Sequence, residues 1–369
     1  MRRLSAHKKT HSLVSSIDHY LLAAVGVLVF FGLIMVYDAA VVQAFKDHND
    51  KYYYIKQQLI WMVLGIGTLT FFSYFNYQNL RKLALPLLIL SIILLLAVSL
   101  PGLGISAGGA HRWLRIGPFT IQPAEIIKLS CIIFFATLFE KKVRTAPFLM
   151  LTLFVIGVLG ILQRDLGSAG VYFLTMLTLY IYAGGPLKYF MYLLPISAAG
   201  LLAFILMFGY RVNRVKAVLN PFADPQGYTY HISQVLIAIG SGGIFGLGIG
   251  QSRQKFEYIP EVTTDSIFAI VGEELGLVGS LFLISLFVFL IYRGFKISEK
   301  INDPFGKLLS FGLITWIAVQ ALINIGAMVS LIPLTGVPLP FISYGGSALL
   351  ANLMAIGILL NISKHRTAN

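Results

Sequence analysis

Charge is scarce in this chain. Asp, Glu, Lys and Arg together make up only 12% of its 369 residues, whereas 57% of the residues are hydrophobic. That balance excludes a soluble globular domain and is typical of a protein that crosses a membrane several times. The sequence also lacks 20–50-residue repeats, low-complexity tracts and any boundary that would mark a separate soluble domain. We therefore expect a single membrane domain over residues 1–369.

The cysteine and histidine residues form neither a disulfide pattern nor a metal-binding pattern. The one cysteine, Cys131, lies inside an apolar run, so no disulfide framework and no zinc-binding spacing is available. The histidines show no ligand spacing, which argues against a metal site built on them. A cleavable signal peptide is not evident either, because the basic N-terminal segment precedes an apolar run of spanning length without an A-x-A-like cleavage site.

Acidic residues are outnumbered by basic ones, 15 to 28, which gives a formal net charge of +13. A basic chain can bind nucleic acid. Here, however, the basic residues gather in short loops beside apolar runs, a pattern better explained by membrane topology and anionic lipids. We expect membrane lipids as partners and no nucleic acid.

Ten apolar runs are long enough to cross about 30 Å of hydrocarbon at about 1.5 Å per residue. The sequence thus predicts an all-α polytopic membrane protein with ten transmembrane helices, near residues 18–40, 57–75, 83–100, 122–140, 147–163, 169–185, 189–210, 266–292, 308–330 and 347–363. An even number of spans puts both termini on one side. Basic residues occupy every loop on that side, which places it in the cytoplasm, with residues 1–17 and 364–369 as cytoplasmic tails.

Three predicted outer segments are longer and richer in glycine, proline and polar residues than the other connections: 101–121, 211–265 and 331–346. Long loops in a compact protein tend to be functional. The largest lies between helices 7 and 8 and begins with an amphipathic piece that carries Arg214 on its polar side. In the last segment, Ser343 and Tyr344 offer hydroxyl groups near the membrane plane.

Asp265 lies where the large loop turns into the eighth predicted span. A carboxylate at the edge of the hydrocarbon is costly to desolvate, so it usually has a function. The same residue could simply cap the helix that begins there. Glu257 and Glu261 before it, and Glu273 and Glu274 after it, are more charge than a cap requires.

Basic and aromatic residues are adjacent in the second outer segment. Arg112 and Arg115 beside Trp113 would suit an anionic phosphate group. The alternative is an interfacial anchor, because arginine and tryptophan are common at membrane edges.

Two further charged pairs lie at the ends of predicted spans. Glu125 and Lys128 are three residues apart on one helix face. They could form an ion pair that pins the helix, the wall of a polar cavity, or both. Arg164 and Asp165 could be a solvated turn or part of a polar site.

Five motifs, in this order along the chain, resemble the SEDS family (shape, elongation, division and sporulation), typified by RodA and FtsW: GGAHRWLRIGPFTIQPAEIIKLS, QRDLGSAG, GYTYHISQVLIAIGSGGIFGLGIG, YIPEVTTDSIFAIVGEELG and TGVPLPFISYGGS. The resemblance runs from the first span to the last. It implies a ten-helix protein of the bacterial cytoplasmic membrane. The implied activity is that of a peptidoglycan glycosyltransferase polymerising lipid II at the outer face, for elongation or division. A class B penicillin-binding protein, the transpeptidase, is the implied partner.

Carried onto this sequence, the resemblance implies that Asp265 is the catalytic base. The residues implied in substrate or pyrophosphate binding are Arg112, Trp113, Glu125, Lys128, Asp165, Ser343 and Tyr344, and we add Arg115 because of its charge beside Trp113. No cofactor is required, although a divalent cation, Mg²⁺ or Mn²⁺, could assist the leaving group. This chain has Thr263 where the family usually has histidine. It has Thr335 where division-type members commonly have lysine, which favours the elongation branch.

Two other functional classes remain open. A lipid-precursor flippase or ion-coupled transporter would use Glu125, Lys128 and Asp165 as coupling groups. The predicted helices lack matching broken pairs in two halves, and the polar groups cluster at one face, which argues against that class. A non-catalytic scaffold for a cell-wall complex is the third alternative.

Overall fold

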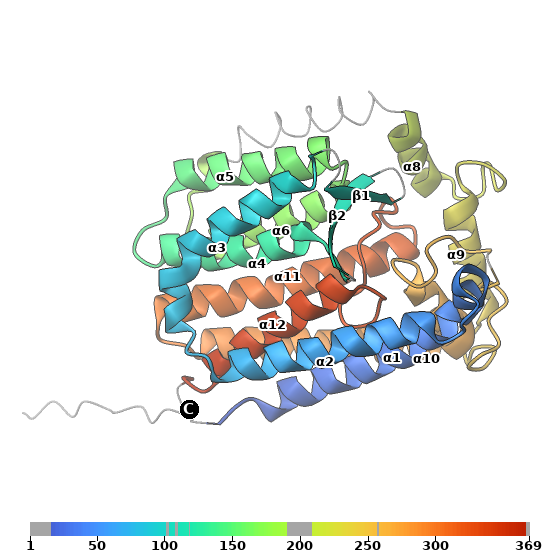
Figure 1. Cartoon of the computed structure of the whole chain (residues 1–369), viewed down its shortest axis with the longest axis horizontal. Coiled ribbons are helices and arrows are strands. Elements are labelled where there is room, and N and C mark those ends of the chain that lie inside the picture. Colours follow the sequence, from blue (N-terminus) through green and yellow to red (C-terminus); the bar gives the residue numbers. More distant parts are fainter. Residues whose placement is uncertain are drawn as a thin grey trace, which may run out of the picture.

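The protein is a bundle of long helices with a small sheet and several irregular segments at one end (Figure 1). The computed structural model describes residues 16–100, 103–107, 110–117, 119–189, 209–256 and 258–366. Seven helical segments among them are long and apolar enough to span a membrane: α1 (His19–His48), α2 (Tyr53–Tyr74), α3 (Gln78–Ala97), α5 with its following π-helical turn η1 (Thr145–Leu162), α10 (Ile267–Glu299), α11 (Pro304–Met328) and α12 (Gly346–Ser363). The prediction of a polytopic helical membrane protein is thus confirmed.

Two shorter helices, α4 (Pro123–Phe139) and α6 (Leu166–Tyr182), complete the described bundle. Their bounds are close to those of the predicted spans 122–140 and 169–185. The predicted span 189–210 lies, apart from its ends, outside the described residues. Beyond it, α8 (Gly209–Leu219) and α9 (Tyr230–Ser241) lie at the same end of the bundle as the sheet (Figure 1).

The helices differ in how much of their surface other helices cover. In α12 and α11 the most apolar 18-residue windows are 89% and 72% buried, whereas in α2 and α3 they are only 17% and 28% buried. Exposed leucine, isoleucine and phenylalanine side chains line the outer faces of α2 and α3. Such faces fit contact with lipid. The bundle is therefore built around α11 and α12.

The all-α prediction is wrong in the segment that follows α3, where the chain forms a three-stranded antiparallel sheet in the order β1-β2-β3. The strands are β1 (Gly104–Ala107), β2 (Ala110–Ile116) and β3 (Phe119–Ile121). Leu114 pairs with Gly104 on one side and with Ile121 on the other. Gly117 adopts a φ of 61° in the turn between β2 and β3, a conformation that glycine accepts at little cost. Short strands with period-two side chains are favoured here over a helix.

α10 is interrupted by Gly276, which has φ 64° and ψ −161°. The glycine-rich segment after α9 packs on this break, and the backbone N–H groups of Leu247 and Gly248 donate to the carbonyl oxygens of Glu273 and Glu274 at 3.0 Å each. The Glu274 carboxylate accepts from Lys255 at 3.0 Å. The two adjacent glutamates in this span therefore hold the glycine-rich segment against α10.

The side-by-side packing of α2 and α12 gives the first prediction. A Cβ on Gly357 of α12 would lie 2.5 Å from the carbonyl oxygen and 2.9 Å from the Cα of Leu69 on α2. Because backbone atoms cannot rotate away, Gly357→Ala should push the helices apart and lower the free energy of unfolding by about 1–3 kcal/mol. The measurement is the Tm of the purified protein in detergent.

The matched control is Gly67→Ala, two residues from Leu69 on the same helix, where a Cβ would meet no atom within 4 Å. It should leave the Tm unchanged or raise it slightly, because alanine favours helix over glycine. Equal Tm values for the two variants would contradict this account of α2–α12 packing.

Candidate functional site

Asp265 lies in the turn that leads into α10. The N-cap residue of α10 is Ser266, and no side chain caps the helix. The carboxylate of Asp265 instead accepts a hydrogen bond from the Thr264 hydroxyl at 3.1 Å. Capping is therefore not the role of Asp265.

The environment of the Asp265 carboxylate makes it a stronger base than an ordinary aspartate. The residue is only 7% exposed. Burial, followed by the nearby negative charge of Glu261, raises the pKa of Asp265 to about 6, although the Arg214 guanidinium acts in the opposite direction. A carboxylate with this pKa is still mostly ionised at neutral pH. It can accept a proton there with more driving force than a carboxylate of normal pKa.

The backbone of Asp265 is fixed by a buried amide from α11. The side-chain nitrogen of Asn324 donates to the carbonyl oxygen of Asp265 and to that of Val337, at 2.8 Å each. Asn324 is 1% exposed, so water does not compete for these bonds. One side chain therefore ties the turn before α10 to the segment between α11 and α12.

Gly336, next to Val337, lies close to both the Arg112 guanidinium and the Asp265 carboxylate. Its φ is 66°, and a Cβ placed on it would lie 3.4 Å from Nη1 of Arg112 and 3.8 Å from Oδ2 of Asp265. The guanidinium and the carboxylate thus border the same small space, on residues that are far apart in the sequence. Glycine keeps that space clear of a side chain.

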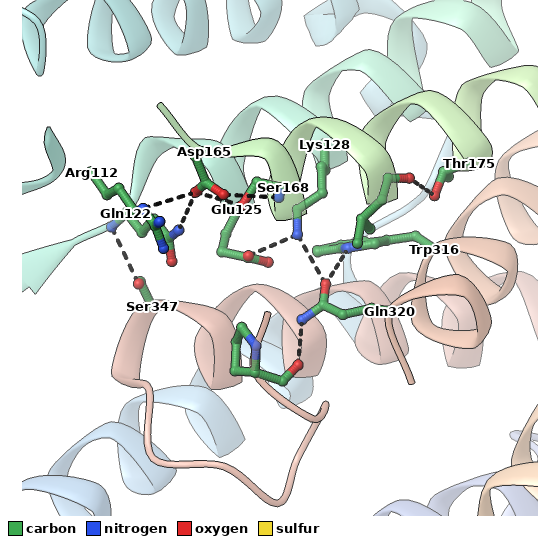
Figure 2. A network of polar contacts seen from close by, with 12 residues as sticks. Arg112, Gln122, Glu125, Lys128, Asp165, Ser168, Thr175, Trp316, Gln320 and Ser347 are labelled. Atoms are coloured by element: carbon green, nitrogen blue, oxygen red, sulfur yellow. Dashed lines mark hydrogen bonds and ion pairs between the residues drawn. The ribbon is translucent and has the colours of Figure 1, made fainter. Parts of the chain in front are cut away.

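Arg112 also contacts a buried polar cluster at the start of α6, drawn in Figure 2. Its Nε lies 3.6 Å from Oδ2 of Asp165, which is 1% exposed. Asp165 is the N-cap of α6 and accepts from the backbone N–H of Ser168 at 3.0 Å and from its hydroxyl at 2.8 Å. Gln122 donates to the same carboxylate at 3.5 Å. Asp165 is therefore a buried cap that pairs with Arg112 and not a solvated turn residue.

Glu125 and Lys128 lie behind this cluster and form a buried ion pair (Figure 2). Lys128 Nζ donates to Oε1 of Glu125 at 2.7 Å and to Oε1 of Gln320 at 2.9 Å. Gln320 in turn donates to the carbonyl oxygen of Pro338 at 3.1 Å. Glu125 and Lys128 are 1% and 0% exposed, which favours the interpretation that they pin α4. Through Gln320 they also support the segment that carries Gly336.

The other predicted site residues lie elsewhere. The pairing of β1 with β2 shifts register at Arg112, which lies between His111 and Trp113, the partners of Ser106 and Ile105. Arg115 is exposed, whereas Arg112 is partly buried. Among the described residues, no hydrogen bond or ion pair joins Trp113 or Arg115 to Arg112 or Asp165.

Ser343 and Tyr344 shape the end of the segment before α12. The Ser343 hydroxyl accepts from the backbone N–H of Leu339 at 2.8 Å, so it holds the turn. The Tyr344 ring packs edge-on against Tyr54, with centroids 5.1 Å apart. Its backbone N–H donates to the carbonyl oxygen of Thr263 at 2.9 Å. Thr263 thus joins this segment to the turn that holds Asp265.

Sequence reasoning missed the buried amides and one histidine. Gln320 and Asn324 are polar residues four apart in the apolar helix α11, a signal that was available. His231 of α9 lies 2.8 Å from the hydroxyl of Ser266 through its Nε2. Burial, aided by Arg214, lowers the pKa of His231 to about 4 and keeps the imidazole neutral. Glu257 lies outside the described residues.

A protein-held metal ion does not fit this site. Within the described ranges, no three histidine, cysteine, aspartate or glutamate side chains are grouped as metal ligands. The charged neighbours of Asp265 include the cations Arg112 and Arg214.

Comparisons with known proteins show the family to which the chain belongs. Residues 18–368 match the family model of the cell cycle proteins FtsW, RodA and SpoVE. The chain belongs to this family. It is 39% identical over 350 residues to stage V sporulation protein E of Bacillus subtilis, covering 92% of this chain and 94% of that protein. It is 38% identical over 344 residues to the "probable peptidoglycan glycosyltransferase FtsW" of Geobacter metallireducens, covering 91% and 92%.

Solved structures of the family share the fold. A chain of a peptidoglycan synthase complex that coordinates polymerization and crosslinking superposes with a TM-score of 0.76 at 27% identity, over 95% of this chain and 98% of that one. The rod shape determining protein RodA of Thermus thermophilus gives a TM-score of 0.69 at 25% identity, over 96% and 98%. The expected SEDS membership is confirmed. The preference for the elongation branch stays a prediction, since the two relatives above are named for sporulation and for FtsW.

The raised pKa of Asp265 predicts how the stability of the protein depends on pH. Burial favours the protonated carboxyl, so the stability that protonation contributes is full below the ordinary pKa of 3.8 and is lost as pH rises through about 6. At pH 8, Asp265→Asn should therefore have a free energy of unfolding about 1–3 kcal/mol larger than that of the wild type. Its Tm should be correspondingly higher. The difference should shrink at pH 5.

Thermal unfolding in detergent at the two pH values measures this difference. The control is Asp47→Asn, which changes an exposed carboxylate at the end of α1 and should show no pH-dependent gap. A wild type more stable than Asp265→Asn at pH 8 would show that the carboxylate is not destabilised by burial.

Proposed function

We propose that this chain is a peptidoglycan glycosyltransferase that polymerises lipid II into β-1,4 glycan strands at the outer face of the cytoplasmic membrane. The observation that carries the proposal is the convergence of the Asp265 carboxylate and the Arg112 guanidinium on the space in front of Gly336. The FtsW relatives, named as peptidoglycan glycosyltransferases, support the reaction class.

The reaction needs one base and one cationic group. The 4-hydroxyl oxygen of the acceptor GlcNAc attacks C1 of the donor MurNAc, and the bond from C1 to the undecaprenyl pyrophosphate breaks with inversion. Asp265 takes the hydroxyl proton as the oxygen attacks. Arg112 stabilises the negative charge that develops on the departing pyrophosphate. Its contact with Asp165, at 3.6 Å, holds the guanidinium at the site.

The neighbouring elements keep these two groups in position. Asn324 fixes the backbone of Asp265 and of Val337, and Gln320 supports the same segment at Pro338. A displacement of about 1 Å at a reacting group can cost about 10²-fold in rate. The buried amides of α11 are therefore positioning residues in this proposal.

Ten spans with both termini in the cytoplasm remain our proposal for the topology. α6 ends near Tyr182, which contacts Ser298 at the far end of α10. α8 lies at the opposite end, where Arg214 donates to the carbonyl oxygen of Leu334 at 2.8 Å. The end of α6 and the helix α8 therefore lie at opposite ends of the bundle, which supports the predicted span 189–210 between them. The cluster of Asp265 and Arg112 would then face the outside.

A class B penicillin-binding protein is the proposed partner. The support is the likeness to a chain from a complex that coordinates polymerization and crosslinking. A flippase or a pure scaffold has less support, because Glu125 and Lys128 neutralise each other in a closed contact and a base faces a cation at the candidate site. In liposomes given lipid II on one face with the partner present, we expect glycan chains. Translocated lipid alone would indicate a flippase, and neither product would indicate a scaffold.

Removal of the base tests the catalytic assignment. Asp265→Asn should lower the rate of lipid II polymerisation by about 10²- to 10⁴-fold, because the acceptor hydroxyl loses its proton acceptor. The measurement is the appearance of glycan strands from lipid II by the purified protein with its partner. Wild-type polymerisation by a folded, partner-bound Asp265→Asn would rule out this base.

The two arginines of β2 provide a matched pair. Arg112→Gln should lower the polymerisation rate by about 10²- to 10³-fold, since it removes the cation that faces Asp265. Arg115→Gln removes the same charge from an exposed position of the same strand and should change the rate by less than about twofold. Equal losses in the two variants would show that only the net charge of the sheet matters.

A further inference from the structure

A basic cavity lies at the end of the bundle opposite Asp265. Its volume is about 380 Å³, and the start of α3, the end of α4 and the connection from α4 to α5 enclose it. That volume is within the roughly 300–1,000 Å³ range of ligand pockets. α4 has 17 residues, so its length, about 26 Å, separates this cavity from the candidate active site at its other end. None of the proposed catalytic groups lies here.

The rim of the cavity is strongly cationic. Five basic side chains line it against a single carboxylate, Glu140. Glu140 is engaged by Arg81 at 2.9 Å. The four remaining basic residues are exposed, and none has an ion pair within the part of the chain that the structure describes: Lys82, Lys141, Lys142 and Arg144. This excess of unpaired positive charge calls for an anionic ligand.

Arg81 reaches the inner part of the same cavity. Besides Glu140, it contacts Asp303 at 3.3 Å. Its Nε is buried and has no hydrogen-bond partner among the described residues. Guanidinium groups match phosphate oxygens well.

Apolar side chains line the cavity as well. They include Leu85 of α3 and Phe134 and Leu138 of α4. Leu85 is 55% exposed on a helix that is long and apolar enough to span the membrane. A free anion would leave this apolar surface in water, whereas an acyl chain would cover it.

We propose that this cavity binds one anionic phospholipid, with the phosphate of the headgroup among Arg81, Lys82 and Lys142 and an acyl chain along Leu85, Phe134 and Leu138. Its charge complements the anionic lipids of a cytoplasmic leaflet, the side on which the proposed topology puts it. The site is independent of the glycosyltransferase reaction. Its function is to tie the start of α3 and the α4–α5 connection to the membrane surface.

The test uses the full chain and phosphatidylglycerol as the probe. The protein is purified in detergent and titrated with phosphatidylglycerol or phosphatidylcholine, and the bound lipid is counted by native mass spectrometry. We expect one tightly bound phosphatidylglycerol and no equivalent phosphatidylcholine. Lys82→Gln with Lys142→Gln, one in α3 and one in the α4–α5 connection, should raise the Kd of that lipid roughly 30-fold. Both side chains are exposed, so the fold should survive.

The matched control removes two charges at the same end of the bundle but outside this cavity, with Lys188→Gln and Lys296→Gln. It should leave the Kd within about twofold of the wild-type value. Equal weakening in both double variants would overturn the proposal, because it would show a diffuse charge effect. Displacement of the lipid by inorganic phosphate, or equal binding of phosphatidylcholine, would overturn it as well.

Discussion

The candidate site depends on the side-chain amide of Asn324. This one group, buried in the apolar helix α11, bonds to the backbone carbonyl oxygens of Asp265 and Val337 at 2.8 Å each. Leaving a buried carbonyl without a donor costs about 1–3 kcal/mol. The two segments therefore favour the arrangement in which both reach Asn324. In that arrangement the Asp265 carboxylate and the Arg112 guanidinium face each other across Gly336.

Buried charge is concentrated where it holds irregular backbone in place. Lys255 bridges Asp38 and Glu274 beside the break in α10, and Lys128 bridges Glu125 and Gln320 beneath the segment before α12. An isolated charge in such surroundings would cost several kcal/mol, so each is paired. Asp265 differs, because burial, followed by the negative charge of Glu261, raises the pKa of its carboxylate to about 6. Such a shift is typical of functional groups.

Much of this arrangement could be predicted from the sequence. Run length predicted the spanning helices, and the position of Asp265 at the start of an apolar run marked it as a functional candidate. The small sheet was missed, because three short strands in a glycine-rich loop give little periodicity. The contact of Arg112 with Asp165 likewise depends on the irregular pairing of β1 with β2, which the sequence does not indicate.

The contacts that fix the site could not be predicted. Asn324 and Gln320 reach segments elsewhere in the chain, and only the packing of α11 in the centre of the bundle determines which carbonyl groups they meet. The helix cap role of Asp165 and the absence of such a role for Asp265 depend on where each helix begins, to within one residue. Two aspartates in similar sequence positions thus have different environments.

The most direct test of the account is the pH dependence of lipid II polymerisation by the wild type and by Glu261→Gln, each with its partner. A base with a pKa of about 6 must be ionised to act, so the rate should rise with pH through about 6. Glu261→Gln removes a negative charge that raises this pKa, and should move the rise to lower pH. A rise that stays at the same pH in Glu261→Gln, or a rate independent of pH, would contradict the assignment of Asp265 as the base.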